Sequence, residues 1–157
     1  MSNELFDLPG WEQLLRVSVR LVVAAVLGGV LGIEREREGK PAGLRTHMLV
    51  ALGAALFTVA PLEAGMSIGD LSRVFQGIAA GIGFLGAGTI LKLTGGEEIK
   101  GLTTAAGLWL TAAIGMAVGS GRIWIPIVGV LIALIILSGL GVLERFLKTS
   151  RNRSKEE

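Results

Sequence analysis

The densest group of chemically capable side chains in this sequence is the segment EREREGKPAGLRTH, residues 34–47. Its carboxylates could bind a cation, its arginines could bind an anion, and His47, the only histidine, could move a proton. A metal site usually needs several His, Cys or acidic ligands, and the chain has no cysteine and no second histidine. His47 therefore predicts no metal centre by itself, and a pH-sensing role remains open.

Other polar candidates are scattered along the chain. Asp70 and Arg73 are three residues apart, which on a helix makes either an exposed ion pair or a gate or partner contact. Thr46, Thr103 and Thr104 stand where helices should begin, and we expect them to act as caps. No Ser/His/Asp grouping, no cysteine nucleophile and no pair of buried carboxylates is evident, so the sequence predicts that the protein is not an enzyme.

The elements that must carry these residues are apolar helices. The chain of 157 residues is 51% hydrophobic and only 18% charged, and its mean hydropathy is +0.65. Its apolar residues gather in long runs without the period-2 alternation of barrel strands, so we expect an all-α membrane protein. A spanning helix needs roughly 20 apolar residues. Five candidate spans follow, at 17–33, 48–62, 77–93, 102–119 and 123–143.

The residues between these spans extend or join the helices. Residues 34–38 should continue the first helix, 39–43 should make the turn, and 44–47 should begin the second helix. Ser67-Ile68-Gly69-Asp70 fits a capping box and predicts that the third helix begins before its apolar run. We expect one transmembrane domain over 1–147 and a basic, polar tail over 148–157.

Lys and Arg residues predict the orientation. The 34–47 loop, the connection between the third and fourth spans, and the tail hold eleven of them, whereas the opposite side holds few. The positive-inside rule then places the N-terminus outside and the C-terminus in the cytoplasm, with the lipid bilayer as the main partner. Trp11 and Trp124 fall at the outer interface, as aromatic anchors do.

Glycine is abundant inside the spans. Gly77–Gly88 predicts close helix packing, because small residues let backbones approach in lipid. The alternative is a locally unwound stretch, Gly81–Gly88, that offers backbone carbonyls to an ion. Gly28/Gly32 and Gly115/Gly119 give the first and fourth helices similar faces, so three mutually packed helices are expected.

An internal repeat appears at an offset of 58 residues. Between 27–60 and 85–118 there are eight identities without a gap, which indicates two parallel hairpins followed by a fifth helix. The offset places Glu34 on Lys92, so these two side chains could face each other across a pseudo-axis. The alternative is that each reaches the interface separately.

The spans contain almost no acidic residue, which argues against a carboxylate-lined cation channel. Magnesium prefers oxygen ligands and would find only backbone carbonyls and threonine hydroxyls at mid-membrane.

The ordered motifs LGGVLGIEREREGKPAGLRTHMLVALGAALFT, D-x-x-R, QGIAAGIGFLGAGTIL and GLTTAAGLWLTAAIGMAVG resemble the membrane domain of the MgtC/SapB family. The resemblance covers about residues 15–120. It implies a bacterial inner-membrane protein of about five spans, linked in characterised members to growth under magnesium limitation and to inhibition of the F-type ATP synthase. Long members continue into a soluble cytoplasmic domain, and the resemblance implies a short member without it. The motif positions, together with Lys92 from the repeat, are Glu34, Arg35, Glu36, Arg37, Pro41, Gly43, Leu44, Arg45, Thr46, His47, Asp70, Arg73, Gly81, Gly83, Phe84, Gly86, Gly88, Lys92, Gly101, Leu102, Thr103, Thr104 and Trp109.

Two functions are therefore open. The first is a non-enzymatic membrane regulator that binds another membrane protein or a second copy of itself. The second is a cation transporter or channel, with magnesium as the ion. We expect no cofactor and no nucleic-acid partner in either case.

Overall fold

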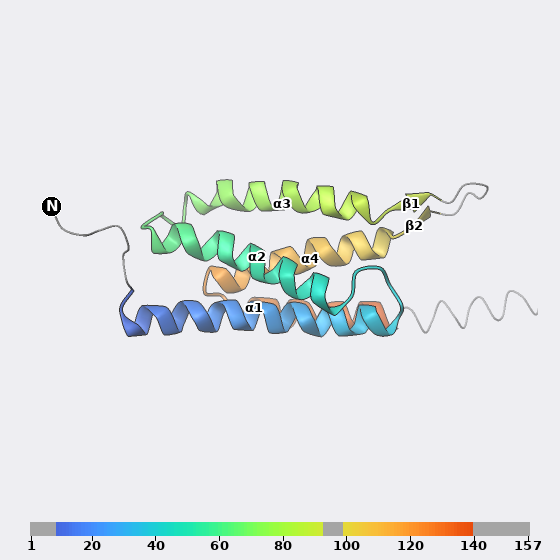
Figure 1. Cartoon of the computed structure of the whole chain (residues 1–157), viewed down its shortest axis with the longest axis horizontal. Coiled ribbons are helices and arrows are strands. Elements are labelled where there is room, and N and C mark those ends of the chain that lie inside the picture. Colours follow the sequence, from blue (N-terminus) through green and yellow to red (C-terminus); the bar gives the residue numbers. More distant parts are fainter. Residues whose placement is uncertain (1–8, 93–98, 140–157) are drawn as a thin grey trace, which may run out of the picture.

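The computed structural model describes residues 9–92 and 99–139, and this part of the chain is a bundle of five α-helices with one short β-hairpin (Figure 1). The helices run roughly along one common axis, and the two hairpin strands pair antiparallel at one end of the bundle. The helices are α1 (Trp11–Arg37), α2 (Leu44–Glu63), α3 (Leu71–Gly88), α4 (Leu102–Gly119) and α5 (Trp124–Leu134), which continues as a π-helical turn over Ile135–Gly139; the strands are β1 (Leu91–Lys92) and β2 (Ile99–Lys100).

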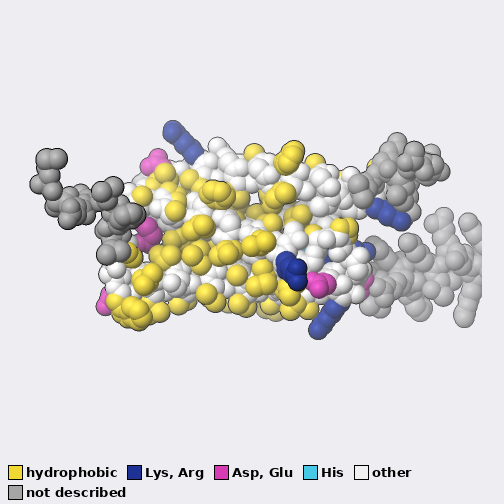
Figure 2. All heavy atoms as spheres, in the orientation of Figure 1, with side chains coloured by type: hydrophobic (Ala, Val, Ile, Leu, Met, Phe, Trp, Pro, Cys, Tyr) yellow, Lys and Arg dark blue, Asp and Glu magenta, His cyan; other side chains and the backbone are white. Residues whose placement is uncertain are grey.

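The all-helical class is confirmed, and three helices are long and apolar enough to cross a membrane by length and composition: α1, α2 and α4. The structure leaves many large apolar side chains exposed, Phe57 and Trp109 among them. Figure 2 shows hydrophobic side chains over the middle of one face and charged ones towards the ends. An apolar middle between charged ends is typical of a protein that faces lipid.

The helix ends agree with several predictions. α1 continues through the charged residues to Arg37, residues 39–43 make the turn, and α2 begins at Leu44. α3 begins at Leu71, before its apolar run, and the Asp70 N–H donates to the Ser67 hydroxyl at 3.3 Å. The Ser67 hydroxyl donates in turn to the Asp70 carboxylate, so half of the expected capping box is present.

Other boundaries were predicted wrongly. α3 ends at Gly88 and not near residue 93, because the chain turns into β1 and packs the Thr89 backbone against Gly101. A Cβ at Gly101 would overlap the Thr89 carbonyl, and Gly101 also has a φ of +96°. Thr46, Thr103 and Thr104 are not caps. The residues before α2 and α4 are Gly43 and Gly101, which have no side chain to cap with.

The centre of the bundle is α2, which lies between α1 and α4. A Cβ on Gly28 of α1 would lie 2.6 Å from the His47 carbonyl oxygen, and one on Gly115 of α4 would overlap the Ala51 carbonyl oxygen. Gly32 and Gly119 make similar approaches further along the same helices. The predicted close packing of the first and fourth helices is thus confirmed, and α2 is the helix on which both of them pack.

The two predictions for the glycines of the third helix have different outcomes: local unwinding is wrong, and packing among the described residues is found at Gly86. Gly81–Gly88 lies within a continuous α-helix, so it is not unwound. At Gly77, Gly81, Gly83 and Gly88 a Cβ would meet nothing within 4 Å among the described residues, so no packing contact is seen at these four glycines there. Only Gly86 makes an ordinary contact, at 3.4 Å from the Ala105 Cβ.

The internal repeat is present in the structure. α2 begins at Leu44 and α4 at Leu102, which is the 58-residue offset, and each follows a glycine. Gly28 faces His47, and the equivalent Gly86 faces the equivalent residue Ala105. Both hairpins run in the same sense in Figure 1. The halves differ after these contacts, because α1 continues as a helix where α3 gives way to β1.

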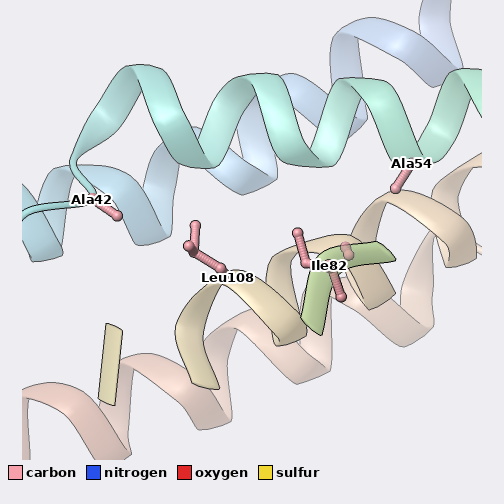
Figure 3. Close-up of a cluster of buried hydrophobic side chains, with 5 residues drawn as sticks. Ala42, Ala54, Ile82 and Leu108 are labelled. Atoms are coloured by element: carbon pink, nitrogen blue, oxygen red, sulfur yellow. The ribbon is translucent and has the colours of Figure 1, made fainter. Parts of the chain in front are cut away.

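Apolar side chains from four parts of the chain fill the space beside α2. Ala42 from the first turn, Ala54 of α2, Ile82 of α3 and Leu108 of α4 are all buried and converge in one cluster (Figure 3). This cluster lies against the polar residues at the start of α2 described next.

Candidate functional site

The turn between α1 and α2 is closed by a carboxylate. The Leu44 N–H donates to Glu36 Oε2 at 2.8 Å, so Glu36 supplies the cap that Gly43 lacks. A Cβ on Gly43 would lie 2.8 Å from the same oxygen, so glycine is the residue that leaves room for this carboxylate. A Cβ on Gly32 would lie 2.7 Å from the Leu44 Cα. These contacts hold the end of α1 tightly against the first turn of α2.

Arg35 lies buried beside this turn. It is 3% exposed, and Arg35 Nη1 lies 3.5 Å from Glu34 Oε2. Among the residues that the structure describes, the Arg35 Nε and Nη2 atoms and Glu34 Oε2 have no hydrogen-bond partner. A buried guanidinium with donors left over is unusual, because each unmade hydrogen bond to a charged group weakens the folded state.

His47 in the first turn of α2 is also buried, at 1% exposed. His47 Nδ1 lies 2.7 Å from the Thr111 hydroxyl oxygen of α4. The Thr111 hydroxyl oxygen also lies 2.8 Å from the Gly107 carbonyl oxygen, so this hydroxyl joins the imidazole ring to the backbone of α4. The direction of the His47–Thr111 hydrogen bond depends on the imidazole tautomer, and Nε2 has no hydrogen-bond partner among the described residues.

The structure brings together only part of the predicted site. Glu34, Arg35, Glu36 and His47 meet where α1 ends and α2 begins. The side chain of Lys92 lies outside the described part of the chain, so its pairing with Glu34 stays a prediction. The other predicted residues near this end are Arg37, Arg45 and Thr103, which are exposed, Thr46, which is half-buried, and Thr104, which is buried.

Asp70 and Arg73 lie at the opposite end of the bundle, where α3 begins. Both are exposed, and they line a shallow depression together with Pro61 and Val74. Asp70 is engaged by Ser67 and makes no ion pair with Arg73 among the described residues.

An apolar groove opens between α2 and α3. Its volume is about 670 Å³, and it is lined almost entirely by apolar atoms. Gly53 and Phe57 of α2 form one wall, and Gly77, Gly81 and Leu85 of α3 form the other. Of the remaining predicted residues, Gly83, Phe84 and Gly88 on α3 and Trp109 on α4 are exposed outside this lining, while Gly86 is buried.

Sequence reasoning missed Thr111 and Gly107, which complete the environment of His47. The signal that could have identified Thr111 is its isolation, since it is the one hydroxyl residue in the apolar stretch 105–119. A lone polar side chain in such a stretch commonly bonds to a neighbouring helix.

These features define a helical membrane protein whose apolar bundle encloses a small polar cluster at one end. The match to known proteins agrees: residues 21–146 match the MgtC family, and the chain belongs to that family.

Three relatives show how the chain compares. It is 45% identical over 142 residues to Protein SrpB of Synechococcus elongatus, covering 83% of this chain and 78% of that protein. It is 44% identical over 126 residues to YhiD of Escherichia coli (strain K12), described as a "Putative magnesium transporter", covering 76% and 58%. It is 46% identical over 115 residues to Protein MgtC of Brucella abortus, covering 72% and 46%. The match therefore spans about half the length of the last two relatives. No solved structure matches the chain.

Proposed function

We propose that this protein is a non-enzymatic regulator in the bacterial inner membrane, which supports adaptation to magnesium limitation by binding a transmembrane helix of another membrane protein. Family membership supports a magnesium-related membrane function. The observation that carries the finer proposal is the apolar groove between α2 and α3.

The internal repeat supports a helix as the occupant of this groove. On α4, the face formed by Leu108, Thr111 and Gly115 is buried against α2. The 58-residue offset maps that face onto Val50, Gly53 and Phe57 of α2, and these three residues line the open groove. The same face is thus covered by a helix in one half of the molecule and left open in the other.

The glycines that line the groove support the close approach of a partner helix. Gly53, Gly77 and Gly81 have nothing within 4 Å of a Cβ position, so no contact in the described part of the chain requires them to be glycine. Glycine in a helix costs roughly 1 kcal/mol relative to alanine. A partner helix whose backbone packs directly against these glycines would explain why they are present despite this cost, because small residues let helices approach closely in membranes.

The proposal includes a topology. α3 and the helix from Trp124 onward would cross the membrane together with the three spans of sufficient length, which gives five spans. The end that holds Arg35, Arg37 and Arg45 would face the cytoplasm, and the N-terminus would lie outside. The predicted span residues 140–143, the rest of the predicted domain to 147 and the tail 148–157 lie outside the described residues.

The test is growth of a strain that lacks the chromosomal copy, complemented with Gly81→Leu or Gly83→Leu in limiting magnesium. Both glycines lie on α3 with open space at Cβ, but only Gly81 lines the groove. We expect Gly81→Leu to block docking and abolish complementation, and Gly83→Leu to complement fully. Equal growth of the two variants at matched membrane levels would refute the proposal that the groove binds a partner helix.

Photocrosslinking then identifies the occupant. A photoreactive residue at Phe57 in the groove should capture one discrete membrane protein, and capture should be lost with Gly81→Leu but kept with Gly83→Leu. A probe at Val22 of α1, which is 61% exposed outside the groove, is the matched lipid-facing control. If the probe captures only a second copy of this chain, the occupant of the groove is that copy and not a different membrane protein.

Cation transport is the second candidate. The description of YhiD and the internal repeat favour it. Liposomes that hold the purified protein and an internal magnesium-sensitive dye would test it. Magnesium flux that is lost with Glu34→Gln or Asp70→Asn would overturn the regulator proposal. No flux above empty liposomes would exclude transport.

A further inference from the structure

The apolar groove continues into the charged depression at one end of the bundle. Val74 of α3 lines both of them, and the depression, with a volume of about 460 Å³, lies where α2 ends and α3 begins. Asp70 and Arg73 line the depression, and both side chains are exposed. The groove and the depression together therefore form one hollow with a long apolar part and a short charged part, which is the layout of an amphiphilic molecule.

The groove is open along one side. Leu49 and Phe57 at its edge are 67% and 68% exposed, whereas Ala54 and Ile82 at its floor are buried (Figure 3). Water needs polar partners to occupy a hollow, and the groove offers almost none. In a bilayer the groove is therefore filled by hydrocarbon.

The length of the groove matches one leaflet of a bilayer. Val74 and Leu85 mark its two ends on α3 and are eleven residues apart, which is about 16 Å along the helix axis. The hydrocarbon of one leaflet is about 15 Å thick, half that of the whole bilayer. An acyl chain that begins at the depression would thus fill the groove to its far end.

The charges in the depression favour a particular headgroup. Arg73 makes no ion pair among the described residues, and its guanidinium suits a phosphate. The Asp70 carboxylate accepts a hydrogen bond from the Ser67 hydroxyl and has further lone pairs for an ammonium group. A zwitterionic phosphoethanolamine headgroup supplies both partners, whereas a phosphoglycerol headgroup supplies only the phosphate.

We propose that the hollow between α2 and α3 binds one phosphatidylethanolamine molecule. One acyl chain lies in the groove, the phosphate lies beside Arg73, and the ammonium group lies beside Asp70. In the topology proposed above, this lipid belongs to the outer leaflet. The site goes beyond the proposed function and does not rest on it, because the lipid is what fills the groove when no partner helix is bound.

The test measures the lipids that stay bound to the purified full chain. The protein is reconstituted in bilayers of equimolar phosphatidylethanolamine and phosphatidylglycerol with identical acyl chains, extracted in mild detergent and analysed by native mass spectrometry. We expect one phospholipid per chain, with phosphatidylethanolamine enriched by up to about fivefold, the factor that one exposed ion pair supplies. No retained phospholipid, or the two lipids retained at their bulk ratio, would overturn the proposal.

Substitutions in the depression test the headgroup contacts. Asp70→Asn should remove the preference for phosphatidylethanolamine, and Arg73→Gln should lower the retention of both lipids. Arg122→Gln is the matched control, because Arg122 is exposed in the loop between α4 and α5, outside the depression, and this variant should bind lipid like the wild type. An unchanged preference in Asp70→Asn, or unchanged retention in Arg73→Gln, would be incompatible with the proposed contacts.

Substitutions in the groove test the acyl chain. Gly81→Leu places a side chain in the groove and should lower phospholipid retention, whereas Gly83→Leu adds the same side chain outside it and should not. Equal retention in the two variants would show that the acyl chain lies elsewhere. Because the measurement uses no partner, the two proposals can fail separately: retained lipid with equal growth of the two variants supports the lipid site alone, and unequal growth without retained lipid supports the partner helix alone.

Discussion

The packing of α4 on α2 makes a sharp prediction about Gly115→Ala. The added methyl group would overlap the Ala51 carbonyl oxygen and lie 2.8 Å from the Ala54 Cβ. A backbone oxygen in the middle of a helix cannot rotate away, so α4 must move off α2. Overpacking of this kind costs about 1–3 kcal/mol.

Gly81→Ala is the matched control. It is the same change in the middle of a helix, but its Cβ would meet nothing within 4 Å. It removes only the intrinsic penalty of glycine and should stabilise the protein by up to about 1 kcal/mol. The two variants should therefore differ by about 1–4 kcal/mol in the free energy of unfolding, measured in mixed micelles with increasing denaturing detergent.

A second substitution, at Ala51, tests whether each added methyl group meets the side chain or the backbone of Ala51. Gly28→Ala would meet the Ala51 Cβ at 2.7 Å as well as the His47 carbonyl at 2.6 Å, so adding Ala51→Gly should restore part of its lost stability. Gly115→Ala meets the Ala51 backbone, so the same addition should restore little. Equal rescue of both variants, or equal stability of Gly115→Ala and Gly81→Ala, would refute the described packing.

Two further predictions concern buried contacts. Thr111→Val should destabilise the protein by about 1–3 kcal/mol, because it leaves the buried His47 Nδ1 without its hydrogen-bond partner. Thr58→Val loses only a bond to its own helix and should change stability by less than about 1 kcal/mol. Equivalent losses in the two valine variants would contradict the assigned His47 hydrogen bond. Gly101→Ala combines a positive φ with overlap onto Thr89 and should destabilise the protein clearly. Gly39→Ala has a positive φ of +64° but open space at its Cβ, so it should lower the free energy of unfolding by only about 1 kcal/mol. Circular dichroism melts would measure both, and a harmless Gly101→Ala would be inconsistent with the described turn.

The sequence predicted those features that local pattern determines. The apolar runs identified every helix, and the spacing of Gly28/Gly32 and Gly115/Gly119 identified two packing faces that the structure confirms. The start of α2 at Leu44 followed from the turn residues before it.

Long-range contacts decided what the sequence could not predict. α3 ends at Gly88 because Gly101, beyond the strand pair, comes against Thr89. The burial of His47 depends on Thr111, which is 64 residues away. The glycines of α3 have the same spacing as those of α1, and only the arrangement of the other helices shows that they face open space. Spacing therefore indicates a face that can pack closely but not its partner.

α2 carries residues of both the polar cluster and the groove, so the packing of that helix determines how the two are coupled. α2 supplies His47 to the polar cluster and Phe57 to the groove, so it is the direct connection between them. The approaches of Gly28 and Gly115 to its backbone leave it no room to shift sideways. α3 is less confined, since its closest glycine contact is the ordinary one between Gly86 and Ala105. We therefore expect any opening or closing of the groove to come from movement of α3 against a fixed α2.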